Sequence, residues 1–260
     1  MNSKKFQREN LRRGIYILPN VFTSLNLFCG FYAVIASIDG KFLAAAVSII
    51  IAGVFDNLDG KIARATHTTS KFGVEYDSLA DLISFGIAPG VMMYLWSLKP
   101  LGRIGWLAAF LFMACGALRL ARFNTQVGTV NSDYFVGLPI PAGAGMTAVT
   151  VLICHKFNIG GDAQPILMLI MLYALSFLMV SSIKYNSFKK PELFNKMKFN
   201  ALVLVILIFI FIASQPSIAL FLCGVLYVTS GPFNTLKRYR NMKRKKAEKL
   251  EGNEQKSEFV

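Results

Sequence analysis

The feature that most restricts the fold of this chain is a series of long apolar stretches separated by short polar or basic segments. Most of these stretches can cross a hydrocarbon core about 30 Å thick, since a helix rises about 1.5 Å per residue. Charged residues make up 16% of the chain, against about 25% in a typical soluble domain. The sequence therefore predicts an all-α polytopic membrane protein. The eight predicted spans are residues 21–38, 42–62, 78–98, 104–123, 136–155, 164–183, 199–213 and 217–233.

The distribution of Lys and Arg predicts the orientation of these spans. If both termini lie on one side, that side carries 24 of the 28 Lys and Arg residues. Basic residues accumulate on the cytoplasmic side of membrane proteins, so we expect both termini to be cytoplasmic and the protein to lie in the cell (inner) membrane. This topology also accounts for the net charge of +14, and no nucleic acid partner is expected.

Four aspartates interrupt the second and third apolar stretches: Asp56, Asp59, Asp77 and Asp81. The first two are spaced i,i+3 and the last two i,i+4, so each pair projects from one face of its helix. An ionised Asp at the centre of a membrane helix costs about 2.5–3.5 kcal/mol, and the nearby Lys61 and Arg64 are too few to neutralise four. An excess of hard oxygen ligands suits Mg²⁺, Mn²⁺ or Ca²⁺. The cluster predicts a two-metal site, which also serves phosphoryl-type displacement.

Other catalytic chemistries find little support in the sequence. The four cysteines stand alone in apolar segments, without the paired spacing of a metal site. No Ser-His or Cys-His pair is evident for a covalent intermediate. We therefore predict direct in-line displacement.

The pattern Asp56-x2-Asp59-Gly60-x2-Ala63-Arg64-x8-Gly73-x3-Asp77-x3-Asp81 resembles, without a departure, the signature of the CDP-alcohol phosphatidyltransferase family. The resemblance implies a membrane enzyme, built on a six-helix core and homodimeric, that transfers the phosphatidyl group of a CDP-linked lipid to an alcohol and releases CMP. It implies that the four aspartates hold two divalent cations, Mg²⁺ or Mn²⁺, and that Asp81 is also the general base. The residues that it assigns to CDP-lipid binding are Asn20, Asp56, Gly60, Arg64, Ser70 and Gly73.

The sequences flanking this pattern bear on the acceptor alcohol. "LPNVFTSLNLFCGFYA", "GALRLARFN", "FVGLPIPAGAG" and "MVSSIKYNSFK" are similar to the branch of the family that acts on CDP-diacylglycerol and L-serine. Serine brings a carboxylate that requires a cation. We take Arg119, Arg122 and Lys184 as candidates for binding the serine carboxylate or a lipid phosphate, although each could instead anchor a helix end at the membrane surface.

Two alternative functions stay open at this point. The first keeps the family and changes the acceptor to glycerol 3-phosphate or an inositol compound, for which we would expect a denser basic pocket. The second is a divalent-cation transporter that uses the acidic cluster as its ion site. A transporter of this kind would show inverted repeats and broken helices around a midplane site, and the sequence has no visible repeat.

Four segments follow from these patterns. Residues 1–18 form a basic cytoplasmic segment, and residues 19–190 form the catalytic transmembrane core. Residues 191–236 form a C-terminal hairpin interrupted at Pro216. Residues 237–260 form a basic cytoplasmic tail that we expect to be disordered and that could contact anionic lipid headgroups.

Overall fold

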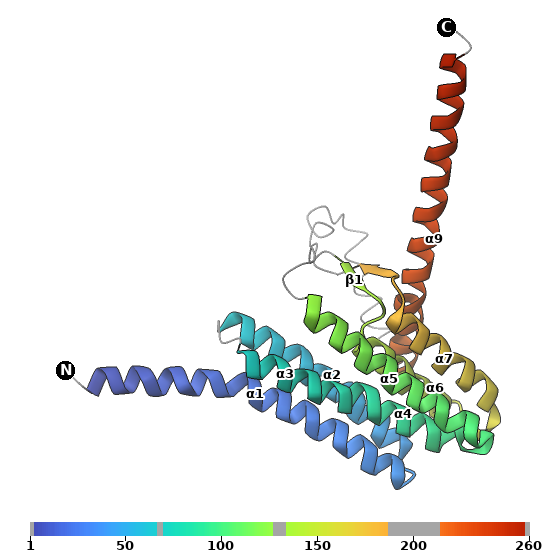
Figure 1. Ribbon diagram of the computed structural model, residues 1–260. Helices are drawn as coiled ribbons and strands as arrows, with labels where there is room; N and C mark the ends of the chain where they lie inside the picture. The colour runs from blue at the N-terminus through green and yellow to red at the C-terminus, as the bar shows by residue number, and fades with distance from the viewer. Residues whose placement is uncertain (1–2, 67–69, 127–133, 187–213, 258–260) are drawn as a thin grey trace.

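The structure is a computed structural model, and it describes residues 3–66, 70–126, 134–186 and 214–257. Nearly all of these residues are helical, which confirms the predicted all-α fold class. Helices α1 to α7 pack side by side, while the N-terminal part of α1 and the C-terminal part of α9 project from this bundle (Figure 1). The helices are α1 (Ser3–Ile38), α2 (Phe42–Ala65), α3 (Lys71–Asp81), α4 (Ala88–Met93), α5 (Arg103–Gln126), α6 (Ile140–Lys156), α7 (Pro165–Val180) and α9 (Pro216–Ser257).

Five of the described helical stretches are long and apolar enough to cross a membrane: Leu18–Ile38, Phe42–Ala65, Lys71–Leu101, Arg103–Thr125 and Pro216–Thr235. Helices α6 and α7 fall short of the length predicted for the fifth and sixth spans, with 17 and 16 residues, or about 25 Å each. The predicted seventh span, 199–213, lies outside the described residues. Large apolar side chains such as Phe28, Phe177 and Leu226 are 64–73% exposed, as expected where lipid replaces water around the bundle.

Small residues allow α1 and α2 to pack closely. Ala33 and Ala36 of α1 and Ala45, Ala46 and Ala52 of α2 are fully or almost fully buried. Without large side chains at these positions the two backbones can approach, which is how helices associate within lipid. This contact brings the N-terminal half of the α1 span beside the end of α2 that carries the first two aspartates.

The third span is a continuous helical stretch that begins at Lys71, earlier than the predicted start at residue 78. Its first residue follows Ser70, whose Oγ accepts a hydrogen bond from the N–H of Gly73 at 2.9 Å and so caps the helix. Wide π-helical turns occupy Leu82–Ile87 and Tyr94–Leu98. The first of them lies directly before Pro89, which has no N–H and would clash with the carbonyl one α-turn earlier. The wide turn lets the helix continue past this proline.

A small antiparallel ribbon joins the ends of α5 and α7. Strands β1 (Tyr134–Val136) and β2 (Lys184–Asn186) pair with Phe135 opposite Tyr185. Gly137 then turns the chain with a φ of +78°, a conformation that favours glycine. Helix α6 begins at Ile140, between Pro139 and Pro141.

Helix α9 departs from the prediction at its C-terminal end. We expected disorder over residues 237–260, but α9 continues without a break to Ser257. The segment 237–257 is rich in Lys, Arg and Glu, all of which have high helix propensity.

A buried tyrosine holds α9 against the core. Tyr185 of β2 is fully buried, and its hydroxyl donates to the Val228 carbonyl of α9 at 3.1 Å. Its ring lies directly against Gly231, where any larger residue would meet it. Burial, together with the neighbouring Tyr227, raises the pKa of Tyr185 to about 12, so the hydroxyl stays protonated and remains a donor. This contact fixes the part of α9 that reaches the cavity described next.

Candidate active site

A cavity of about 480 Å³ lies between α2, α3, α5, the start of α6 and α9. All four aspartates predicted as metal ligands line it, and so do the two arginines Arg64 and Arg119. Phe123, Ile140 and Tyr227 contribute apolar and aromatic surface. The cavity therefore combines a concentrated negative charge with a small number of cations, in a largely apolar surrounding.

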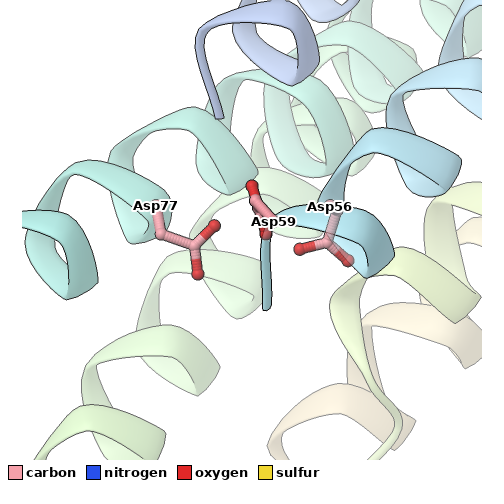
Figure 2. A group of neighbouring side chains, drawn as sticks. All are labelled: Asp56, Asp59 and Asp77. Atoms are coloured by element: carbon pink, nitrogen blue, oxygen red, sulfur yellow. The ribbon is translucent and has the colours of Figure 1, made fainter. Parts of the chain in front are cut away.

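Three of the carboxylates face one another across the gap between α2 and α3 (Figure 2). One oxygen each from Asp56, Asp59 and Asp77 lies within 4.8 Å of the other two. The carboxyl group of Asp81, one helical turn after Asp77, lines the same cavity. The structure thus brings together the two pairs that the sequence placed on separate helices.

No side chain in the described part of the chain forms an ion pair with this cluster. Within the part of the chain that the structure describes, the one ion pair shorter than 4.0 Å joins Lys41 to Asp39, both outside the cavity. Oδ1 of Asp77 is buried and has no hydrogen-bond partner among the described residues. Clustered carboxylates with an unused buried oxygen are stable when a hard cation binds between them. The donor set therefore fits divalent cations.

Two polar residues of α1 that the sequence analysis did not select also contact the cluster. The hydroxyl of Thr23 donates to Oδ2 of Asp59 at 2.9 Å, and Nδ2 of Asn26 donates to Oδ1 of Asp81 at 3.1 Å. Both side chains are buried. The available signal was their i,i+3 spacing within an apolar stretch, which puts them on one helix face, but the sequence could not say which face meets the aspartates.

Arg119 is the buried cation of the site. Its residue is only 8% exposed, and its Nε has no hydrogen-bond partner among the described residues. The other two predicted acceptor-binding residues are placed differently. Arg122 is not among the cavity-lining residues, and its Nη1 donates to the Val180 carbonyl at the end of α7 at 3.0 Å. Lys184 belongs to β2. Their binding role stays a prediction.

The residues predicted to bind CDP-lipid form two neighbouring groups. Gly60 and Arg64 line the cavity, and Nε of Arg64 donates to the Gly60 carbonyl at 2.8 Å. Asn20, Ser70 and Gly73 meet at the N-terminus of α3, outside the lining. A side chain at Gly73 would approach Ser70 Oγ to 3.1 Å and Asn20 Oδ1 to 3.5 Å. The glycine therefore permits α1 and α3 to come close at this point, and Ser70 acts there as a helix cap.

Comparison with known proteins identifies several relatives. A CDP-diacylglycerol–serine O-phosphatidyltransferase of Helicobacter pylori is 38% identical over 208 residues, which cover 80% of this chain and 87% of that protein. A protein of the same name from Bacillus subtilis is 40% identical over 174 residues, covering 66% and 92%. The archaetidylserine synthase of Methanothermobacter thermautotrophicus is 36% identical over 187 residues, covering 71% and 73%.

The family match covers α2, α3, α5 and α6, which line the cavity, and it ends before α9. The model of the CDP-alcohol phosphatidyltransferase family matches residues 16–180, which extend from the start of the first membrane-crossing stretch to the end of α7. All four clustered aspartates, and both arginines that line the cavity, lie within this range. The family model thus matches the part of the chain that carries the acidic residues of the cavity. This chain therefore belongs to the CDP-alcohol phosphatidyltransferase family.

Proposed function

We propose that this protein is a phosphatidylserine synthase, which transfers the phosphatidyl group of CDP-diacylglycerol to the hydroxyl of L-serine and releases CMP. The observation that carries this proposal is the joint presence of four carboxylates and one buried arginine in a single cavity. The carboxylates suit the diphosphate chemistry of the family, and the arginine suits an acceptor that carries its own carboxylate. The names of the relatives support this choice. Two bacterial relatives are named CDP-diacylglycerol–serine O-phosphatidyltransferase, and an archaeal relative is named archaetidylserine synthase.

Two divalent cations, Mg²⁺ or Mn²⁺, are the cofactors that this site would take. The four aspartates would hold them, because the donor set is all oxygen and includes one buried oxygen without another partner. When bound, such ions neutralise the charge of the diphosphate and of the departing CMP. The protein itself supplies the arrangement of acids on two helices and the apolar walls that limit water.

Asp81 would take the proton of the serine hydroxyl. As the proton moves to the carboxylate, the serine oxygen forms a bond to the phosphorus that carries diacylglycerol, and the bond from that phosphorus to the CMP oxygen breaks. CMP departs with the bonding electron pair, and phosphatidylserine remains. Asp81 is 8% exposed, so bulk water has little access to the base. Arg64 and Gly60 would hold the CDP end of the lipid substrate beside the acids.

Arg119 would bind the serine carboxylate. A guanidinium group can hold a carboxylate with two parallel hydrogen bonds, and the Nε of Arg119 is buried and unused by the described residues. Glycerol 3-phosphate carries more negative charge than serine and would need additional cations. Among the described cavity-lining residues, only Arg64 and Arg119 are basic, so the cavity favours serine over a phosphorylated alcohol.

We further propose that the active site faces the cytoplasm and that both termini lie on that side of the inner membrane, since 24 of 28 Lys and Arg residues are then cytoplasmic. Residues 19–190 would form the catalytic core, and the chain would work as a homodimer, as its resemblance to the family implies. A cysteine introduced at the end of α9 would test the orientation, through its accessibility in sealed inverted vesicles compared with right-side-out vesicles.

An acceptor panel tests the function directly. Purified protein with Mn²⁺ and labelled CDP-diacylglycerol is expected to form phosphatidylserine and an equal amount of CMP when L-serine is added. It should give little product with glycerol 3-phosphate or inositol. CMP release that does not depend on serine, or preferred use of another alcohol, would refute the serine assignment. Metal uptake into vesicles without lipid turnover would favour transport instead.

Replacing Arg119 by alanine is expected to raise the KM for serine by about 10- to 100-fold, as for the loss of a hydrogen bond between charged groups. The KM for CDP-diacylglycerol should change by less than about threefold. Arg103, exposed at the opposite end of α5, provides the control, and Arg103→Ala should leave both constants unchanged. An equal rise in both KM values for Arg119→Ala would argue against a role in serine binding.

A further inference from the structure

We propose that Thr23 and Asn26 of α1 are positioning residues that hold the carboxylates of Asp59 and Asp81 in their working orientation. This inference rests on the proposed function and assigns α1 a task in it. Helix α1 carries none of the four acids, and yet it supplies a hydrogen-bond donor to one acid on each of the other two helices. It thereby ties the two halves of the cluster to a common support.

The geometry of the pair is specific. Thr23 and Asn26 are separated by one helical turn, and they are 3% and 0% exposed. Thr23 reaches Asp59 on α2, while Asn26 reaches Asp81 on the third span. The Thr23 hydroxyl has one proton and two acceptors in range, Asp59 Oδ2 at 2.9 Å and the Pro19 carbonyl at 3.2 Å. The carboxylate is the nearer acceptor, and a hydrogen bond to a charged group is the stronger of the two.

Packing alone does not explain these polar side chains. A valine in place of Thr23 and a leucine in place of Asn26 would fill similar space without burying polar atoms in a membrane-spanning helix. Asn26 even leaves its Oδ1 buried without a partner among the described residues, a cost that leucine would avoid. What asparagine adds and leucine lacks is the hydrogen bond to Asp81. We therefore attribute the asparagine at this position to the active site and not to the stability of the helix pair.

A second contact fixes the position of Asn26 relative to its acid. Ser84, in the π-helical turn that follows Asp81, donates from its buried hydroxyl to the main-chain carbonyl of Asn26 at 2.9 Å. Two hydrogen bonds therefore connect α1 with the third span at this point, one through the side chain of Asn26 and one through its main-chain carbonyl. Gly30, one turn further along α1, allows this approach because its hydrogen lies directly against Ser84.

The chemical consequence differs between the two contacts. Each donor occupies one carboxylate oxygen and leaves the other for a cation or a proton. Asp59 belongs to the group of three acids whose oxygens lie within 4.8 Å, so Thr23 acts on metal affinity. Asp81 is the proposed base, so Asn26 acts on turnover. Neither α1 residue contacts the reacting atoms; both act by orienting a residue that does.

The metal-binding part is tested on the substrate-free protein. Mn²⁺ affinity, measured from the electron paramagnetic resonance signal of free Mn²⁺, is expected to fall about 10- to 100-fold in Thr23→Val, as is usual when a partner of a metal ligand is lost. Thr23→Ser keeps the hydroxyl and should bind Mn²⁺ within about threefold of the wild type. Equal affinity of Thr23→Val and the wild type would overturn the assignment of Thr23.

The turnover part is tested with Asn26→Leu. We expect kcat to fall about 10- to 100-fold, while the KM values for serine and CDP-diacylglycerol stay within about twofold. A rise in both KM values with kcat unchanged would overturn the role of Asn26. Mn²⁺ affinity should fall less than in Thr23→Val, because Asp81 is not one of the three acids whose oxygens lie within 4.8 Å of one another.

Ser48→Ala is the matched control for both variants. Ser48 is buried and donates from α2 to the Cys29 carbonyl of α1 at 2.9 Å, so its replacement removes a hydrogen bond between α1 and α2 that does not involve the acids. It should lower the melting temperature while leaving Mn²⁺ affinity and kcat unchanged. If Ser48→Ala weakens Mn²⁺ binding as much as Thr23→Val, the effect is structural and the proposal fails. Failure of the wild type to form phosphatidylserine would instead refute the proposed function and leave the Mn²⁺ result standing.

Discussion

Asp81→Asn is expected to lower kcat by about 10²- to 10⁴-fold, the usual contribution of a general base. Asparagine preserves the shape of the side chain and can still accept the hydrogen bond from Asn26, but it cannot take up the proton of the serine hydroxyl. Binding of CDP-diacylglycerol, measured in the absence of serine, should stay close to that of the wild type. The measurement is CMP release under saturating substrates.

The matched control for Asp81→Asn is the same substitution at an acid outside the cavity. Asp162 is exposed in the turn before α7 and does not line the cavity, so Asp162→Asn should be fully active. If Asp81→Asn turns over at the wild-type rate, Asp81 is not the general base. Loss of CDP-diacylglycerol binding together with turnover would mean that its main role lies in metal binding and not in proton transfer.

Asp77→Asn is expected to change two measurements in opposite directions. In the absence of metal, removing one charge from the cluster relieves repulsion among unpaired carboxylates. The melting temperature should therefore rise, by about 2–4 °C for each kcal/mol relieved. In the presence of Mn²⁺, the added stabilisation seen in the wild type should shrink, because one ligand is missing. Turnover should fall about 10²- to 10³-fold, as for the loss of several kcal/mol of charge stabilisation.

Glu75 provides the control for this variant, since it lies two residues earlier on α3 and is exposed. Glu75→Gln removes a charge from the same helix without altering the cluster, and it should change neither the metal-free melting temperature nor the response to Mn²⁺. A metal-free Asp77→Asn protein that melts below the wild type would show that the carboxylate stabilises the fold by itself. That outcome would contradict the description of the cluster as a group of repelling acids that awaits cations.

The sequence by itself determined the class of fold and the identity of the acidic residues. Apolar stretches of membrane-crossing length leave helices as the solution, because every backbone N–H and C=O must be paired within lipid. The i,i+3 and i,i+4 spacings of the aspartates fixed which of them share a helix face, since this follows from the helical repeat alone. The start of α6 near Pro139 is also a local feature, because proline favours helix ends through its own backbone geometry.

Only the tertiary structure decided which residues meet across helices. Arg119, Arg122 and Lys184 were equivalent as cations in the sequence, yet packing puts Arg119 in the cavity, turns Arg122 toward the Val180 carbonyl and leaves Lys184 in β2. Thr23 and Asn26 looked like ordinary polar residues until α1 was packed against the two acidic helices. The rotation of one helix against another depends on the side chains of both, and a single sequence pattern describes only one helix at a time. For that reason the acids could be predicted from sequence, and their partners could not.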